Sequence, residues 1–469
     1  MPPATPSSIV STNPISALLT IINSSTTELQ SLHAQNGSQI PSLDAYYKPS
    51  LLEGDPRVVE LTKLVVAAAN QLIATVRAPR DTFWEYVPGM YLSAALGFVV
   101  EVDVAEILNE APNKSLHAKD IAFAANCDAS HIARVLRYLA TRHIFREVTP
   151  DVFANNKLSS ALIKTNGKTV KELKAKPLEK YENSGNAAFV GHLVGEGLKS
   201  SSAMIDFLKN SRKGANSPFN MAWGTNKSLW DWYAEPKEEW RFGRFVAAMQ
   251  FVAETYKDSI FQNAYNWASL KSTDVIVDVG GNMGSVSLAI AKMFPETRFV
   301  IQDLPPVIEE AKPFWKAHFP EAIANGRVKL EAHDFFLTQP IKGAAIYFCR
   351  FIIQDWPDAD CIKIMKRLRE AASPTSKLIL FEIGIPYACA DPTRYDADVE
   401  RRSAPYPLIP NLGKGGGSNP TNVDMTMLNL LNGQGRSIGQ FVELGNATGW
   451  KLASAKNDEL SIFTFSAAA

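Results

Sequence analysis

The chain has 469 residues, enough for two or three domains with a large buried core. Its 48 Lys and Arg residues balance its 48 Asp and Glu residues, so the formal net charge is zero. A neutral chain without a basic stripe gives no electrostatic reason to expect a nucleic acid or an anionic membrane as partner.

The sequence also argues against export, membrane insertion and metal binding. The first residues lack the basic and apolar regions of a secretory signal. The longest apolar segment, residues 64–76, is interrupted by Asn70 and Gln71 and is too short to span a bilayer. The four cysteines show no Cys-x-x-Cys spacing. We therefore expect a cytoplasmic protein with reduced cysteines, no membrane anchor and no metal site.

The first hundred residues predict helices. Residues 1–54 are rich in Ser, Thr, Asn and Pro, with one helical pattern over residues 15–32, so a disordered start and a docking helix are expected. Residues 55–77 predict a long amphipathic helix, and residues 91–108 a second helix that is apolar on more than one face. A second subunit would cover such a helix.

Two short helices around the turn Asn126–Asp128 and a hairpin through Pro150 and Asp151 follow, a pattern typical of a winged helix-turn-helix. DNA binding is one function of this motif, with Arg134 and Arg137 on the recognition helix. The neutral charge argues against that function, and we expect a dimerisation scaffold.

Residues 180–258 predict several helices that share a high content of aromatic side chains. These are Phe189, Phe207, Phe219, Trp223, Trp230, Trp232, Tyr233, Trp240, Phe242, Phe245 and Phe251. Most aromatic residues at helical spacing form core, and the remainder would hold a flat, apolar substrate.

The most informative stretch is 275–284, an apolar run that ends at Asp278 and continues into Gly280, Gly281 and Gly284. With a helical pattern and a second apolar run that ends at Asp303, it predicts a β-α-β unit. An acid about 20 residues after the glycines can accept the hydroxyls of an adenosine ribose. The glycine spacing does not suit a pyrophosphate, so S-adenosylmethionine (SAM) fits better than a dinucleotide. The alternative is that the glycines serve packing alone.

Four further strands and one long loop complete the predicted α/β domain. The strands are expected at residues 328–332, 344–351, 377–383 and 460–465. The loop, residues 389–422, is rich in Pro and Gly, as functional lids and disordered segments are. The predicted segments are 1–54, 55–175, 176–258 and 259–469.

Several motifs occur in an order that resembles the plant- and fungal-type small-molecule O-methyltransferases, of the caffeate O-methyltransferase kind. They are Asp278-Val-Gly-Gly281, Asp303-Leu-Pro-Pro-Val307, His333-Asp-Phe-Phe336, Asp355-Trp-Pro-Asp-Ala-Asp-Cys361, Asn432-Gly-Gln-Gly-Arg-Ser437 and, in the first half, Arg142-His-Ile-Phe-Arg-Glu-Val148 and Phe153-Ala-Asn-Asn156. The resemblance implies an α/β fold, with a Rossmann-like SAM-binding domain preceded by a mostly helical winged-helix dimerisation domain. It also implies a homodimer that acts on a small aromatic or polyketide-type substrate of fungal secondary metabolism.

The resemblance assigns a set of cofactor residues, namely Asp278, Gly280, Gly281, Asp303, Asp334, Phe335 and Arg350. In the family pattern the first acid and the glycines line the methionine part of SAM, and the second acid takes the ribose hydroxyls. The third acid and the aromatic residue after it hold the adenine, and a Lys or Arg lies close to the cofactor. A carboxylate suits an amine or a hydroxyl, and an aromatic face suits a purine.

The catalytic residues depart from the family pattern. Methyl-transferring members have a His as general base where this chain has Gln354, and two acids that orient it. The first acid is present as Glu382, but the second position is Gly435. A glutamine can form hydrogen bonds but cannot carry a proton away. The histidines His333 and His192 are alternative bases that the sequence does not place.

Three hypotheses follow. The first is an O-methyltransferase that works by alignment on an acidic hydroxyl, since alignment can be worth roughly 7–11 kcal/mol and a base about 10²- to 10⁴-fold. The second is an enzyme that keeps SAM but performs other chemistry, as fungal pericyclases on this scaffold do, with Gln354 polarising a carbonyl. The third is a non-catalytic SAM-binding protein.

Overall fold

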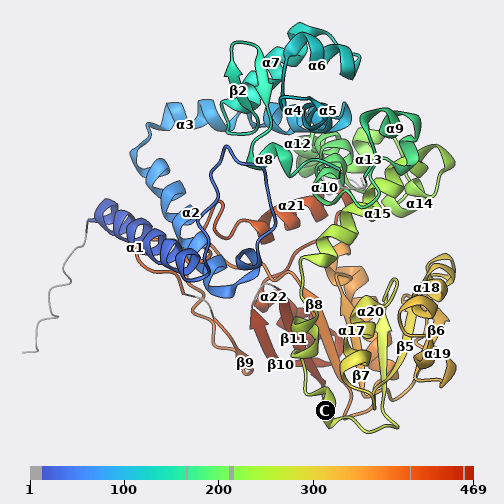
Figure 1. The fold of residues 1–469 in the computed structure, drawn as a ribbon. Helices are drawn as coiled ribbons and strands as arrows, with labels where there is room; N and C mark the ends of the chain where they lie inside the picture. The colour runs from blue at the N-terminus through green and yellow to red at the C-terminus, as the bar shows by residue number, and fades with distance from the viewer. Residues whose placement is uncertain (1–12, 165–166, 211–215, 402, 458–459, 469) are drawn as a thin grey trace, which may run out of the picture. The chain divides into compact units, whose positions relative to one another are not determined.

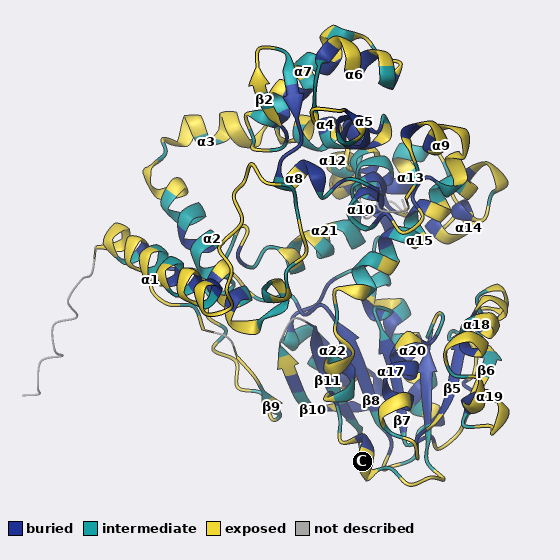
Figure 2. Ribbon diagram, viewed as in Figure 1, coloured by how far each residue is buried: buried dark blue, intermediate teal, exposed yellow. Residues whose placement is uncertain are grey.

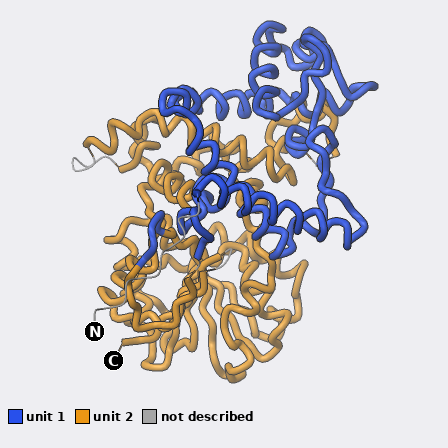
Figure 3. Tube along the Cα trace, turned by 90° about the vertical axis from the view of Figure 1, so that its left-hand side faces the viewer, with its two compact units in different colours: residues 1–163, 387–391, 402–419 blue, residues 164–386, 392–401, 420–469 orange. Residues whose placement is uncertain are grey.

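The computed structural model describes residues 13–164, 167–210, 216–401, 403–457 and 460–468. Within them the chain forms two compact units, which Figure 3 shows in different colours. The first unit comprises residues 13–163, 387–391 and 403–419. The second unit comprises the other described residues. The predicted loop 389–422 therefore contributes to both units. The predicted boundaries after residues 54, 175 and 258 follow a different division and stay predictions.

The first unit is mainly helical (Figure 1). Its elements are α1 (Pro14–Gln35), η1 (Leu51–Gly54), α2 (Pro56–Val76), α3 (Pro79–Tyr86), α4 (Gly89–Glu101), α5 (Val104–Glu110), β1 (Ser115–His117), α6 (Ala118–Ala125), α7 (Ala129–Ala140), β2 (Arg146–Thr149), β3 (Val152–Ala154) and α8 (Lys157–Ser160). α2 begins where predicted because Asp55 caps it, accepting hydrogen bonds from the backbone N–H groups of Arg57 and Val58. α1 packs on α2 through two small clusters around Leu18 and Leu29.

α2 corrects one expectation. Among the described residues it alone is long and apolar enough to cross a membrane by length and composition. The expectation from residues 64–76 missed this, because the helix begins earlier, at Pro56. Its buried residues Leu61 and Ala68 lie in clusters with residues of α1, and 22% of the apolar stretch of α2 is buried.

The helix predicted over 91–108 is two helices. α4 ends at Glu101 and α5 begins at Val104, because Asp103 between them has φ 60°, in the left-handed region that interrupts a right-handed helix.

The helix-turn-helix and hairpin have the predicted elements. Asn126 ends α6 with φ 56°, and Asp128 caps α7. Strands β2 and β3 pair in a sheet of the order β1-β3-β2.

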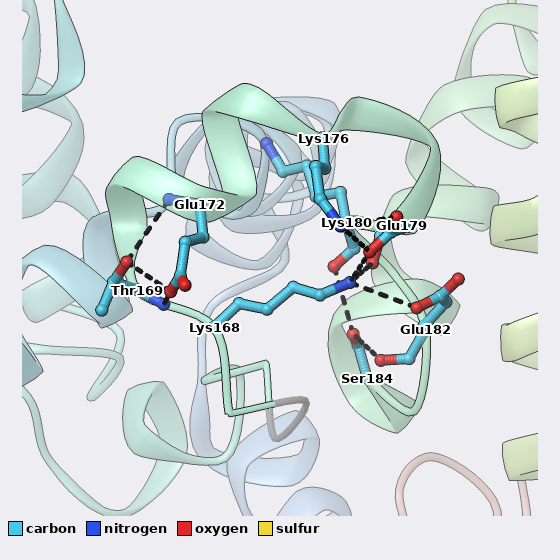
Figure 4. A network of polar contacts seen from close by, with 8 residues as sticks. All are labelled: Lys168, Thr169, Glu172, Lys176, Glu179, Lys180, Glu182 and Ser184. Carbon is cyan, nitrogen blue, oxygen red and sulfur yellow. Dashed lines mark hydrogen bonds and ion pairs between the residues drawn. The ribbon is translucent and has the colours of Figure 1, made fainter.

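The second unit begins with a helical part. Its elements are α9 (Val170–Ala175), η2 (Pro177–Glu179), α10 (Gly185–His192), the π-helix η3 (Leu193–Leu198), α11 (Lys199–Ser201), α12 (Met204–Asn210), α13 (Pro218–Trp223), α14 (Leu229–Tyr233), η5 (Pro236–Glu238), α15 (Glu239–Glu254), α16 (Asp258–Gln262) and η6 (Trp267–Ser269). Figure 4 shows a polar network at the start of this helical part. In it the Lys168 ammonium donates to the Glu179 carboxylate at 2.7 Å and to the Glu182 carboxylate at 3.2 Å. Thr169 and Glu172 form a capping box at the start of α9.

An eight-stranded sheet forms the rest of the second unit. Its strands and helices are β4 (Val275–Val279), α17 (Ser285–Met293), β5 (Arg298–Asp303), α18 (Pro305–His318), α19 (Pro320–Ala324), β6 (Val328–Ala332), β7 (Ile346–Arg350), η7 (Ile353–Asp355), α20 (Asp358–Ala371), β8 (Lys377–Glu382), β9 (Asp398–Val399), α21 (Asn419–Leu431), α22 (Ile438–Thr448), β10 (Trp450–Asn457) and β11 (Ser461–Ala467). The order is β6-β5-β4-β7-β8-β11-β10-β9, with the first five strands parallel and β11 antiparallel to β8 and β10. The sequence interpretation missed β9 and β10.

Both faces of this sheet are covered, and its strands β4, β5, β7 and β8 are largely buried (Figure 2). One core cluster joins the sheet to α16, α17 and α18, with Trp267 and Trp315 at 1% and 0% exposure. The other joins it to α20 and α22 around Tyr347 and Phe441. This is the doubly covered α/β arrangement that the sequence predicts, and it leaves the carboxyl ends of the parallel strands as the edge for a ligand.

Candidate functional site

The predicted polar residues lie at the carboxyl ends of neighbouring parallel strands. Asp278 is in β4, Asp303 ends β5, Arg350 ends β7 and Glu382 ends β8. Backbone hydrogen bonds join these strand ends, since the Gly281 N–H donates to the carbonyl of residue 302. The fold thus brings four residues that span more than 100 positions of sequence to one edge.

The glycine turn after β4 leaves no room for side chains. Gly280 has φ 67°, and a Cβ there would lie 2.6 Å from Ile352 Cδ1. A Cβ on Gly281 would lie 2.6 Å from the Asp278 carboxyl carbon. Gly284 has φ 76° and packs against Trp315. The first two glycines let the chain pass close over Asp278, and the third serves packing.

Asp303 is held by backbone N–H groups. Its two carboxyl oxygens accept from Asn282 N and from Leu304 N, each at 2.8 Å. Burial raises the pKa of Asp303, although these two hydrogen bonds oppose the shift. Each oxygen keeps a further lone pair, so the carboxylate is fixed in place and can accept two hydroxyls.

Asp278 lies beneath the glycine turn and is 2% exposed. Its Oδ2 accepts a hydrogen bond of 2.6 Å from Ser287 Oγ in α17. Burial raises its pKa to about 7, the hydrogen bond from Ser287 opposes this, and the negative charge of Asp303 adds to it. A cationic group beside this acid would stabilise its ionised form.

Asp334 and Phe335 follow β6. The Asp334 carboxylate accepts from Phe336 N at 2.9 Å, which fixes the turn. The Phe335 ring meets Trp356 edge-to-face, with centroids 6.0 Å apart, and its Cε1 lies 3.5 Å from the position of a Cβ on Gly280. The fold therefore brings this ring beside the glycine turn, as stacking on a bound adenine requires.

Arg350 lies among aromatic rings, and it forms no ion pair within the described residues. Its guanidinium carbon lies 5.0–5.8 Å from the ring centroids of Tyr256, Phe261 and Phe351. Its Nε is buried and has no hydrogen-bond partner in the described part of the chain. Burial lowers its pKa, while Tyr256 and Asp278 oppose the shift. An unpaired buried donor of this kind is satisfied when an acceptor of a ligand reaches it.

Gln354 lies in η7, directly after β7, and is 9% exposed. Its backbone carbonyl accepts from Gln434 N at 2.9 Å, and Gly433 packs against the same carbonyl so closely that a side chain there would clash. The side-chain Oε1 is buried and finds no partner within the residues that the structure describes. The backbone of Gln354 is thus fixed, while its amide oxygen keeps an unused acceptor.

Glu382 supports the loop that carries Gln354. It is fully buried, and its Oε1 accepts from Ile353 N at 2.8 Å and from Ile352 N at 3.2 Å. Its Oε2 has no partner among the described atoms. Burial raises its pKa to about 8, with a further increase from the charge of Asp355. Burial therefore favours the protonated form of Glu382, which can donate as well as accept a hydrogen bond.

Arg436 is a site residue that the sequence interpretation left without a role. It is 1% exposed, and it donates to the backbone carbonyls of Ile353, Trp356 and Gln434 at 2.8–2.9 Å. It also pairs with the Asp358 carboxylate at 2.7 Å. The one sequence signal was an arginine inside an otherwise small and polar loop. Through these bonds Arg436 holds the loop of residues 432–437 against the segment that carries Gln354.

Gly435 has a structural reason to be glycine. A Cβ there would lie 2.7 Å from the Ile385 side chain and 3.1 Å from Asp424 Cβ, and the Gly435 N–H donates to the Asp424 carboxylate at 2.8 Å. An acid cannot be restored at this position without moving Ile385.

The two alternative histidines lie in different surroundings. His192 Nδ1 contacts Tyr233 Oη at 3.3 Å and the buried Glu196 carboxylate at 3.4 Å. Burial would raise the pKa of Glu196, but the hydrogen bond to His192 and the charge of Arg244 lower it. His333 follows β6, its Nε2 is buried without a partner in the described chain, and burial lowers its pKa. Neither histidine contacts Gln354 through a hydrogen bond.

The residues at this edge fit SAM by their chemistry. Asp303 offers fixed acceptors for two hydroxyls, Asp278 offers a buried acid for a cationic amine, and Phe335 offers a ring beside a turn whose glycines keep the backbone open. The turn has no run of free N–H groups for a pyrophosphate, because Gly281 N and Asn282 N are already bonded to residues 302 and 303.

The fold and this edge define the class of Rossmann-like, SAM-dependent methyltransferases. Comparison with protein-family models agrees: an O-methyltransferase domain matches residues 203–399, and an O-methyltransferase dimerisation domain matches residues 84–165. An O-methyltransferase of Armillaria gallica is 35% identical, over 93% of this chain and 94% of its own. The chain belongs to the O-methyltransferase family, and it is a SAM-dependent enzyme.

Other relatives and solved structures extend the comparison. A 4-O-methyltransferase of Phanerochaete chrysosporium is 33% identical over 94% of this chain and 95% of its own. The structure of the mitomycin 7-O-methyltransferase superposes with a TM-score of 0.61 at 25% identity, covering 85% of this chain and 99% of its own. A structure described as a pericyclic reaction enzyme gives a TM-score of 0.62 at 19% identity, covering 96% of this chain and all of its own, which shows a shared fold.

Proposed function

We propose that this enzyme methylates a hydroxyl of a small aromatic or polyketide-type metabolite, and that Gln354 orients the acceptor without removing its proton. The observation that carries the proposal is the Gln354 amide: its backbone is fixed by Gln434, and its buried Oε1 keeps an unused acceptor. A hydroxyl that donates to this oxygen would be held in one orientation.

The cofactor half of the site is proposed to work through Asp278, Gly280, Gly281, Asp303, Asp334, Phe335 and Arg350. Asp303 would accept the ribose hydroxyls, Asp278 would face the methionine amine, and Phe335 would stack on the adenine. Bound SAM supplies an electrophilic methyl group. Arg350, among aromatic rings, would add its unpaired Nε–H to the acceptors of the ligand.

The proton of the acceptor hydroxyl leaves without a histidine at position 354. An acidic phenol that donates to Gln354 Oε1 would release its proton to water before the methyl group is transferred, because its pKa is close to the pH of the solution. Protonated Glu382 keeps the Gln354 loop in place by accepting two backbone N–H groups, and it avoids a second negative charge beside a phenolate. Asp355, whose pKa burial raises to about 7, lies in the same loop.

The test is incubation with SAM and a panel of phenols, with S-adenosylhomocysteine quantified by mass spectrometry. The proposal predicts its formation with acidic phenols. Tight SAM binding without any turnover would instead favour the second candidate, a SAM-bound pericyclase or another non-methylating enzyme. The observation that favours this candidate is Gln354 itself, a neutral amide where proton removal calls for a titratable group.

We also propose a homodimer. The chain carries an O-methyltransferase dimerisation domain, and the segment from α2 to α4 exposes a run of large apolar side chains. They are Val76 (64%), Phe83 (63%), Trp84 (75%), Val87 (69%) and Tyr91 (60%). A continuous run of this kind is typical of a protein interface. Sedimentation analysis at micromolar concentration tests the assembly, and a monomer there would contradict it.

A further inference from the structure

The Pro- and Gly-rich segment between β9 and α21, residues 403–418, lies against the two N-terminal helices, and we call it the strap. Figure 3 colours it with the first unit. Leu408 is 7% exposed and lies in one core cluster with Leu18 of α1 and with residues of α2. The carbonyl of Pro407 accepts a hydrogen bond of 2.8 Å from Gln71 Nε2 in α2. The strap is therefore a packed part of the first unit.

Two glycines let the backbone of the strap lie directly on α2. A Cβ on Gly416 would lie 2.8 Å from the Ala67 Cβ and 2.8 Å from the Lys63 carbonyl oxygen. A Cβ on Gly415 would lie 2.6 Å from Val66 Cγ1. Atoms cannot pack this closely, so a side chain at Gly416 forces the strap away from the helix.

One residue of the strap is held in a strained conformation by this packing. Leu412 has φ 62°, in the left-handed region that residues other than glycine rarely adopt. Its side chain packs against the same cluster as Leu408. A strained backbone persists only where the surrounding structure holds it. The conformation of the strap thus depends on its contacts with α1 and α2.

Both ends of the strap lead into the second unit. Before it, Glu400 N donates to the Ala455 carbonyl at 3.0 Å, next to the pairing of β9 with β10. After it, α21 begins at Asn419 and belongs to the second unit from residue 420 onward. The strap is therefore continuous with the first turn of α21.

α21 in turn contacts the loop that holds Gln354. The Asp424 carboxylate accepts from Gly435 N at 2.8 Å, and Gln434 N donates to the Gln354 carbonyl at 2.9 Å. The loop of residues 432–437 is thus bonded to α21 at one residue and to Gln354 at the neighbouring one. A continuous helix and two hydrogen bonds form a physical path from the strap to the Gln354 loop.

We infer that the strap is a conformational device of the acceptor end: docked on α1 and α2, it holds α21 and the 432–437 loop in place, and its release loosens both. The inference rests on the proposed function for the assignment of the acceptor end. SAM binding should not depend on the strap, because the Asp303 carboxylate is bonded to Asn282 and Leu304 in the second unit.

Hydrogen exchange of the full-length chain, followed by mass spectrometry, tests the coupling without any substrate. Leu408→Ala removes a buried contact of the strap, and the control Ile409→Ala removes a similar side chain that is 42% exposed. In Leu408→Ala we expect exchange at least about 10-fold faster in residues 403–418 and in residues 420–437, with residues 275–303 unchanged. Ile409→Ala should exchange as the wild type does. Faster exchange confined to residues 403–418 would overturn the inference.

Gly416→Ala tests the same coupling by a different route and serves if Leu408→Ala does not fold. Its added Cβ meets the α2 backbone at Lys63 and should produce the same exchange pattern. Gly89→Ala, where a Cβ meets nothing within 4 Å, is the matched control. Wild-type exchange in residues 420–437 of a Gly416→Ala protein whose strap exchanges faster would also overturn the inference.

Methyl transfer and SAM binding separate the inference from the proposed function. With 4-nitrophenol as acceptor, kcat/KM of Leu408→Ala should fall about 10- to 100-fold, while the Kd of SAM, measured by calorimetry, stays within about twofold of wild type. An unchanged kcat/KM, or an equal fall in SAM affinity, would overturn the role of the strap at the acceptor end. No turnover of any phenol by the wild type would count against the proposed function, and the exchange pattern would then decide the inference.

Discussion

The proposed cofactor end of the sheet edge, at Asp278 and Asp303, and the proposed acceptor end, at Gln354 and Glu382, are built differently. At the cofactor end, Asp303 and Asp278 are bonded to backbone N–H groups and to Ser287. At the acceptor end, Gln354 and Glu382 each keep a buried side-chain oxygen without a partner in the described structure. The paired acids suit a ligand that never changes, and the unpaired atoms, which include Arg350 Nε at the cofactor end, are completed when a ligand binds.

The acceptor end is nevertheless rigid in its backbone. Arg436 makes hydrogen bonds to three carbonyls, and Glu382 accepts from two N–H groups of the same loop. A site that has decayed has no physical need for such support. The loop therefore holds residue 354 in one position.

The largest effect is expected on SAM affinity, from a substitution at the cofactor end. Asp303→Ala removes the carboxylate that Asn282 and Leu304 hold, and with it the two charge-assisted bonds that we propose it makes to the ribose. We expect SAM affinity to fall about 100-fold or more by calorimetry. Glu309→Gln, an exposed change on the following helix, is the matched control. SAM affinity unchanged by Asp303→Ala would contradict the assigned role.

Arg436→Met should break the backbone support of the acceptor end. Three carbonyls would lose a buried donor, and we expect a loss of about 3–5 kcal/mol in the free energy of unfolding. Urea unfolding measures this. If the folded fraction is sufficient, methyl transfer should fall more than SAM affinity. An equal fall in both would mean that the clamp serves the whole domain and not the Gln354 loop.

Glu382 predicts a pH effect with a definite sign. Its pKa is about 8 in the folded protein against an ordinary value of 4.5, so between these values the folded state holds a proton that the unfolded state lacks. Stability contributed by this group is therefore lost as the pH rises. Wild type should lose about 2 kcal/mol more than Glu382→Gln between pH 6 and pH 8. Identical losses would show that Glu382 is already ionised at pH 6.

The smallest effects concern restoration of a base. Gln354→His alone should raise methylation of weakly acidic phenols about tenfold. Adding Gly435→Glu should lower stability by about 1–3 kcal/mol, because its side chain meets Ile385. Adding Ile385→Ala should relieve part of that loss. A double variant as stable as Gln354→His would contradict the observed packing, and thermal unfolding decides it.

The comparison also explains what could be predicted from the sequence. The glycine turn, Asp303 and the strand ends are local patterns, so residues 275–303 alone indicate the cofactor site. Arg436 contacts a carboxylate 78 positions away, and Asn429 contacts a carbonyl 232 positions away. Such contacts have no local signal. The break at Asp103 was missed for a related reason, because apolar spacing continues through a left-handed residue.

The central claim is that the enzyme transfers a methyl group to a hydroxyl that it orients but does not deprotonate. Single-turnover formation of S-adenosylhomocysteine, measured at pH 7 across phenols of increasing pKa, tests it most directly. The account predicts that the rate falls about tenfold for each unit by which the phenol pKa exceeds the pH. A rate independent of phenol pKa, or none with any phenol while SAM is bound, would contradict it.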